Sequence, residues 1–97
     1  ISFACREMMA MGKPVLVSDY AGLPENIRQG EDGWVVPARD RAAIANALRA
    51  LLATRASLSA MGDAARAHAQ AEFGMERFVD ATEAVYAALV ADFSSRA

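Results

Sequence analysis

Apolar residues fill almost every position from 3 to 11, and only Arg6 and Glu7 interrupt them. This pattern predicts a helix that is buried over most of its circumference. Ser2 is suited to cap the N-terminus of this helix, and Gly12 is suited to end it.

Two short apolar runs predict strands on either side of a turn-rich segment. Residues 14–17, PVLV, form an uninterrupted aliphatic run of the kind buried on both faces of a parallel sheet. Residues 34–36, WVV, follow a turn signal at Asp32 and the next glycine. Between the two runs, we expect Pro24 to open a short helical turn that Gly30 closes. The order of helix, strand, short helix and strand predicts a parallel α/β layer.

After Pro37 the chain becomes rich in alanine and predicts three amphipathic helices, the first capped by Asp40. The second covers about residues 56–72 and the third about residues 75–93. Their apolar faces are Ile44, Leu48, Leu51 and Leu52 in the first, Leu58, Met61, Ala65 and Ala69 in the second, and Phe78, Thr82, Val85, Tyr86, Leu89 and Phe93 in the third. Gly62 lies inside the second helix and predicts a close helix crossing, since glycine there costs about 1 kcal/mol relative to alanine.

Composition and charge exclude several classes of protein. The chain has 97 residues, of which 55% are hydrophobic and 23% charged, so one small domain or a piece of a larger one is expected rather than a disordered segment. The net charge is −2 and there is no basic tract, so we expect no nucleic-acid partner. Cys5 is the one cysteine, which excludes an internal disulfide and a thiolate zinc site and fits a reducing, cytoplasmic setting. The longest apolar run, residues 84–91, is too short to span a bilayer.

Glu7 is the most informative side chain for chemistry. A carboxylate on so apolar a helix either pairs with a cation, is neutralised, or faces a polar cavity, because burying it alone costs several kcal/mol. Arg6 is not its partner, since consecutive residues lie about 100° apart around a helix. Physics alone therefore favours a structural ion pair for Glu7 over a ligand contact. The free amides at Ser2, Phe3 and Ala4 suit a phosphate, but every helix has such an end, so a capped or solvated terminus is favoured.

Other polar residues give weaker signals. Cys5 and His68 lack the orienting groups of a nucleophile and base, and we expect His68 on a helix surface. The acidic residues Asp19, Glu25, Glu31 and Asp32 lack calcium-loop spacing and are expected to be solvated turns and caps. The apolar stripe in residues 83–93 is suited to bind a partner helix, but such a stripe is more often core.

The segment REMMAMGKPVLVSDYAGLPENIRQGEDGWVVP closely resembles the C-terminal nucleotide-binding domain of retaining GT-B glycosyltransferases, the "group 1" or family-4-like enzymes. That family typically reads E-G-F-G-L-x-L-L-E-A-M-A-C-G-x-P-V-V-A-S-D-x-G-G-L-P-E, then D-G-x-x-G-x-L-V-P and a helical tail. The resemblance implies an α/β fold: a fragment of a Rossmann-like GT-B domain with two short parallel strands, followed by three amphipathic helices. Residues 1–37 would be the nucleotide-binding segment and residues 38–97 the helical tail.

The resemblance assigns roles to four residues of this chain. Glu7 matches the second glutamate of the family's E-x7-E motif, which hydrogen-bonds the ribose hydroxyls of the sugar nucleotide. Together with Ile1, the residues Ser2, Phe3 and Ala4 match F-G-L-x, whose amides receive the donor diphosphate. Ser2 replaces a glycine, which affects how closely the loop approaches phosphate. The first glutamate of the motif would lie eight residues before Glu7, upstream of Ile1.

The reaction implied by the resemblance is transfer of a sugar from a nucleoside diphosphate sugar to an acceptor, with retention at the anomeric carbon. No cofactor and no metal ion would be required, and the acceptor would bind a missing N-terminal domain of the same protein. The chain begins without methionine inside an apolar segment, so we expect a fragment of a longer protein, inactive alone and marginally stable or associated. The full enzyme would be cytoplasmic, with peripheral attachment to a membrane compatible with the sequence.

Two alternatives remain open at this point. One is a non-catalytic module in which the three amphipathic helices bind a partner protein. The other is a sugar-nucleotide epimerase of the same architecture, to which the E-x-M-A-x-G-K-P pattern is less well suited.

Overall fold

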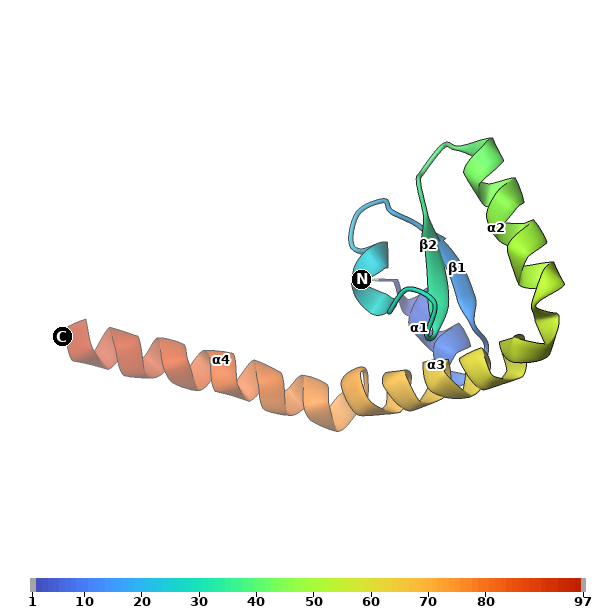
Figure 1. Cartoon of the computed structure of the whole chain (residues 1–97). Helices are drawn as coiled ribbons and strands as arrows, with labels where there is room; N and C mark the ends of the chain where they lie inside the picture. The colour runs from blue at the N-terminus through green and yellow to red at the C-terminus, as the bar shows by residue number, and fades with distance from the viewer. Residues whose placement is uncertain (1, 97) are drawn as a thin grey trace.

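The computed structural model describes residues 2–96 as two parallel strands with helices around them (Figure 1). The elements in chain order are α1 (Phe3–Ala10), β1 (Val15–Ser18), the 3-10 helix η1 (Leu23–Asn26), β2 (Gly33–Val36), α2 (Arg41–Ala53), the 3-10 helix η2 (Arg55–Ser57), α3 (Leu58–Glu72) and α4 (Met75–Arg96). The predicted order of elements is confirmed, and the three predicted amphipathic helices are α2, α3 and α4.

The two strands form a parallel pair in which Val15 lies opposite Gly33 and Ser18 opposite Val36. The predicted strands are confirmed with small shifts at their ends, since β1 starts after Pro14 and includes Ser18. Proline has no N–H to donate to a strand ladder, which fits its place just before β1.

Two local predictions in this layer are wrong. All four residues of β1 are only half-buried, not buried on both faces, because a pair of strands has too few neighbours to cover it. Gly30 does not close the turn opened by Pro24, because η1 already ends at Asn26. Gly30 adopts a φ of 78° in the loop before β2, where its N–H donates to the carbonyl of Gly33 at 2.9 Å.

The core lies between α1 and α3. Its buried members are Cys5, Met9, Ala65 and Ala69, and Val15, Val17, Ile27 and Phe73 pack against them. The expectation that the first helix is buried over most of its circumference is wrong, since only Cys5 and Met9 are buried on α1. Phe3 is 73% exposed and Met11 is 69% exposed. One side of α1 therefore anchors the helix, and the rest of its surface is open.

The predicted caps are present. The Ser2 hydroxyl accepts from the amide of Cys5 at 3.2 Å, and the carboxylate of Asp40 accepts from the amide of Ala43 at 2.9 Å. Gly12 follows α1 with a φ of 79°, a conformation that favours glycine.

Gly62 allows α3 to approach the chain that leaves α1. A Cβ atom placed on Gly62 would overlap the carbonyl oxygen of Gly12 and would lie 3.3 Å from Cδ of Pro14. The close approach predicted at Gly62 is therefore confirmed, but the backbone that it meets belongs to the turn between α1 and β1 and not to a crossing helix.

Helix α4 projects away from the strands (Figure 1), and the molecule extends 61 Å along its longest axis. The expectation that the apolar stripe of the third amphipathic helix is core is wrong, because it is exposed: Phe78 62%, Val85 60%, Tyr86 66%, Leu89 59% and Phe93 78%. Its length and spacing as a helix are as predicted, but no described element covers the stripe. None of the helices described in residues 2–96 has both the length and the apolar character that a membrane crossing requires.

We predict that Gly62→Ala destabilises the fold by about 1–3 kcal/mol, because the added methyl group must displace the carbonyl of Gly12. Urea denaturation followed by circular dichroism measures the change. Gly74→Ala is the matched control, since a Cβ there lies at an ordinary 3.5 Å from the nearest atom, the carbonyl oxygen of Gln70. Equal denaturation midpoints for Gly62→Ala and the unmodified chain would contradict the prediction.

Candidate functional site

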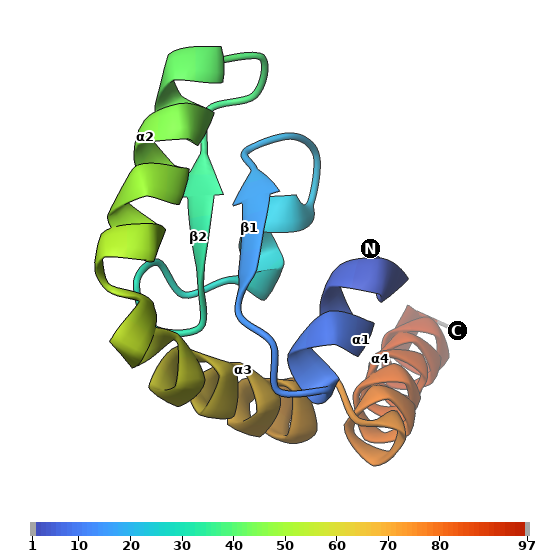
Figure 2. The same cartoon turned by 90° about the vertical axis from the view of Figure 1, so that its right-hand side faces the viewer.

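The N-terminus of α1 is directed toward the side of the sheet at which the strands end. In Figure 2 the strand arrows point away from α3, and α1 runs in the opposite direction to the strands, so its N-terminus is the end remote from α3. The free amides of α1 therefore face the side of the sheet at which the strands end. Crevices outside the carboxyl ends of parallel strands are the usual binding places in open α/β sheets.

Three amides at this helix start remain available to an anion. The Ser2 hydroxyl occupies the amide of Cys5, and the amide of Arg6 donates to the Ser2 carbonyl at 3.2 Å. Within residues 2–96, the amides of Ser2, Phe3 and Ala4 have no acceptor. Ile1, which the sequence also matched to the diphosphate loop, lies outside the described residues.

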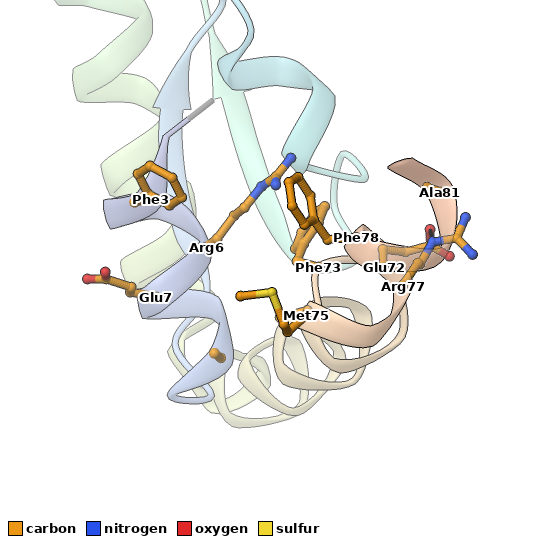
Figure 3. A pocket seen from close by; sticks show the side chains of 11 residues that line it. Phe3, Arg6, Glu7, Glu72, Phe73, Met75, Arg77, Phe78 and Ala81 are labelled. Atoms are coloured by element: carbon orange, nitrogen blue, oxygen red, sulfur yellow. Dashed lines mark ion pairs between the residues drawn. The ribbon is translucent and has the colours of Figure 1, made fainter. Parts of the chain in front are cut away.

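Glu7 is exposed, and the described residues provide no ion pair for its carboxylate. The structural ion pair that physics alone favoured for Glu7 is thus not what the structure shows. Glu7 borders a hollow of about 620 Å³ between α1 and the start of α4, whose lining includes Phe3, Arg6, Phe73 and Phe78. Figure 3 shows the Glu7 side chain turned away from Arg6 and Phe73. Its carboxylate is free to accept hydrogen bonds from a ligand.

Arg6 behaves differently from its neighbour. Its Nε donates to Oδ1 of Asn26 at 2.8 Å, and its guanidinium carbon lies 4.1 Å from the centre of the Phe73 ring. Asn26 is 1% exposed and donates from Nδ2 to the carbonyl of Leu23 at 3.3 Å. Arg6 therefore connects α1 to η1 and to the end of α3.

A second polar cluster fixes α3 to the turn before β2. Asp32 is fully buried and accepts from the amide and Nε of Arg28 at 2.7 and 2.8 Å. Its carboxylate also lies 2.7 Å from Nδ1 of His68. An ionised carboxylate can only accept, so a hydrogen bond to ionised Asp32 requires the tautomer of His68 that has a hydrogen on Nδ1.

Two expectations from the sequence are therefore wrong. His68 is not a surface residue of its helix, since its side chain is 12% exposed. Asp32 is not a solvated turn residue, because it is buried beside Arg28 and His68, whose polar groups take the place of water around its carboxylate. Asp19 does follow the expectation, as an exposed acceptor for the amide of Ala38 at 2.8 Å.

Cys5 and His68 do not form a catalytic pair. The Sγ atom of Cys5 contacts the sulfur of Met9 at 4.0 Å, while His68 is engaged by Asp32. Burial raises the pKa of the Cys5 thiol, although nearby Arg6 acts in the opposite direction. A thiol with a raised pKa stays protonated near neutral pH and is a poor nucleophile. Among residues 2–96 no three His, Cys, Asp or Glu side chains are grouped closely enough to hold a metal ion.

The spacing of residues in α3 does contain a signal that His68 is buried. Met61, Ala65, His68 and Ala69 fall at i, i+4, i+7 and i+8, so His68 belongs to the buried face of α3. The two contacts of Arg6 had no comparable signal in the sequence. Asn26 lies 20 positions from Arg6 and Phe73 lies 67 positions from it, so no local spacing relates them.

Comparison with known proteins places this geometry in a family. A model of the family "Glycosyl transferases group 1" matches residues 1–54. Among curated proteins, the D-inositol 3-phosphate glycosyltransferases of Geodermatophilus obscurus and Streptomyces scabiei are 42% and 40% identical over 89 and 86 residues, which are 92% and 89% of this chain. The lipopolysaccharide core biosynthesis mannosyltransferase LpcC of Rhizobium leguminosarum is 38% identical over 86 residues, 89% of the chain and 24% of that protein.

A solved structure shares the fold. Sucrose-phosphate synthase from Thermosynechococcus elongatus matches with a TM-score of 0.81 and 33% identity, over 95% of this chain and 23% of that one. The chain belongs to the group 1 glycosyl transferase family, and the predicted fold class, an α/β fragment of a GT-B domain, is confirmed. The chain spans about a fifth of the length of the inositol phosphate enzymes that it matches.

We predict that His68→Ala destabilises the fold by about 1–3 kcal/mol, because it leaves the buried carboxylate of Asp32 one donor short. His68→Asn is the matched variant, since its amide retains a donor near the position of Nδ1, and it should lose less stability than His68→Ala. Chemical denaturation measures both. The prediction fails if His68→Ala unfolds at the same denaturant concentration as the unmodified chain.

Proposed function

We propose that this chain is the C-terminal part of a retaining glycosyltransferase, in which it holds the ribose and diphosphate of a nucleoside diphosphate sugar. The observation that supports this most is the state of Glu7, which is exposed and without an ion pair in the described residues, on the helix whose first amides face the carboxyl edge of the sheet. In this proposal residues 1–37 bind the nucleotide, and residues 38–97 form a helical tail.

The two parts of the proposed site suit the two parts of the ligand. The carboxylate of Glu7 accepts hydrogen bonds from the two ribose hydroxyls, and bonds to a charged acceptor are stronger than neutral ones. The amides of Phe3 and Ala4 and the dipole of α1 attract the diphosphate. Ser2 contributes its backbone to the same turn and holds the helix start in place through its cap on Cys5.

The proposed reaction breaks the bond between the donor sugar and the diphosphate and gives the sugar to an acceptor hydroxyl with retained anomeric configuration. Its barrier falls mainly through positioning of the donor and through stabilisation of the charge that develops on the leaving diphosphate. The α1 N-terminus contributes to that stabilisation, and basic side chains elsewhere in the parent protein contribute the rest. No metal ion or other cofactor is part of the proposal.

The proposed acceptor site lies in an N-terminal domain that precedes this chain in the parent protein. The relatives differ in acceptor by their names, which refer to D-inositol 3-phosphate in one case and a lipopolysaccharide core in another. Segments similar to this chain occur in enzymes whose names refer to different acceptors, which fits a role in donor binding rather than acceptor choice.

A second candidate, a non-catalytic helical interaction module, draws support from the exposed apolar stripe of α4. Membership in the glycosyl transferase family favours the enzymatic role. The two candidates differ in the role of Glu7. In the glycosyltransferase Glu7 binds the nucleotide, whereas a non-catalytic interaction module does not require nucleotide binding.

In the parent protein, Glu7→Gln is expected to weaken nucleoside diphosphate binding about 10- to 100-fold, because loss of hydrogen bonds to a charged acceptor costs about 1.5–3 kcal/mol. Isothermal titration calorimetry with UDP, GDP and ADP identifies the bound nucleotide and measures the change. Glu83→Gln on the exposed surface of α4 is the matched control and should bind as the unmodified protein does. Unchanged affinity in Glu7→Gln would refute the proposed donor site.

The isolated 97-residue chain is expected to have no transferase activity, since it lacks the acceptor domain and the first glutamate of the family motif. Incubation with UDP-glucose or GDP-mannose, followed by detection of released nucleoside diphosphate, tests this. Sugar transfer by a monomer of the isolated chain would contradict the expectation.

A further inference from the structure

Arg6 is a charged side chain without a carboxylate partner in the described residues, yet it is held firmly. Its Nε donates to Oδ1 of Asn26 at 2.8 Å. Its guanidinium carbon lies 4.1 Å from the centre of the Phe73 ring, and both side chains are labelled in Figure 3. The described carboxylates that do form ion pairs, those of Glu31, Asp32, Glu72 and Asp92, pair with other cations. Arg6 is thus anchored by a neutral amide and an aromatic face, two contacts that fix the geometry of a planar guanidinium.

Both anchors are themselves held by contacts within the fold. Asn26 is 1% exposed and is tied to the carbonyl of Leu23. Phe73 ends α3, where its amide donates to the carbonyl of Ala69 at 2.9 Å, and its ring packs on His68 with 5.1 Å between centroids. His68 is in turn bound to the buried carboxylate of Asp32. Arg6 therefore connects α1 to two fixed parts of the fold.

Helix α1 needs such a connection. It has eight residues, and its two buried side chains, Cys5 and Met9, lie at i and i+4 along a single line. Packing along one line leaves a short helix free to roll about its axis. Arg6 is displaced by about 100° from that line and holds the helix at a second point, which prevents the roll.

The roll of α1 decides where the carboxylate of Glu7 lies. A helix with its side chains has a radius of about 5–6 Å, so a roll of about 10° moves the end of a side chain by roughly 1 Å. A misplacement of that size is enough to lose much of the benefit of a positioned group. Glu7 is exposed and has no ion pair in the described residues that would resist the movement.

We infer that Arg6 is a positioning residue for the nucleotide site, which acts on donor affinity by fixing the direction of Glu7. The inference rests on the proposed function of Glu7 as a ribose ligand. Arg6 does not touch the nucleotide in this arrangement, and its effect on binding disappears when Glu7 can no longer bind.

A double-mutant cycle in the parent protein tests this, with calorimetric titration of whichever of UDP, GDP and ADP the unmodified protein binds most tightly. Arg6→Met, which keeps the aliphatic length but loses the donor to Asn26, is expected to weaken binding about 10-fold. In the Glu7→Gln background the same change is expected to weaken binding less than 2-fold. Arg66→Met, at an exposed position of α3, is the control and should leave affinity unchanged in both backgrounds.

Arg6→Lys separates positioning from charge and provides a second variant if Arg6→Met folds poorly. Lysine keeps the positive charge above Phe73 but cannot reproduce the bond to Asn26 at the same time, so it should lose several-fold in affinity. Unchanged binding by both Arg6 variants overturns the inference. An equal loss from the Arg6 changes with and without Glu7 also overturns it, while a loss in Glu7→Gln alone leaves the proposed function intact. If Glu7→Gln binds as the unmodified protein does, the proposed function and the inference both fail.

Discussion

The packing of α1 against α3 is the contact on which the other features of this chain depend. Gly62 has no side chain, so the backbone of α3 reaches the carbonyl of Gly12. That approach allows Ala65 and Ala69 to meet Cys5 and Met9, which form the buried core. With α1 held in this way, its N-terminus is directed toward the side of the sheet at which the strands end. Small residues at the crossing are necessary because a core this thin leaves no room for larger ones.

Two kinds of polar residue surround this core, and they differ in what they are bonded to. Asp32 and His68 are paired with each other inside the fold, so their chemistry is used for structure. Glu7 lies on the outer side of α1 with no ion pair in the described residues, so its chemistry remains available. Arg6 shares features with both kinds. It is held by contacts within the fold, as Asp32 and His68 are, and it is next to Glu7 in the chain.

The exposed apolar surfaces of the chain are consistent with its small share of the length of its relatives. The stripe of α4, the outer side of α1 and the half-buried β1 all lack cover from the described residues. A monomeric soluble domain seldom leaves so much apolar surface open. The sequence predicted that these elements are buried, whereas the structure shows them exposed. A pattern of apolar residues indicates a surface suited to packing, but it does not indicate what packs against that surface.

The sequence by itself determined the elements, their order, their caps and the family, because these depend on local periodicity, on residues such as Ser2, Asp40 and Gly12, and on motifs read in one direction along the chain. The ribose and diphosphate residues remain predictions from that motif. Only the tertiary structure decided that Asp32 and His68 meet, that Arg6 both binds Asn26 and stacks on the ring of Phe73, and that Glu7 has no ion pair among the described residues. These contacts join positions far apart in the chain. Local periodicity cannot predict them, because they form only when the folded backbone brings those positions together.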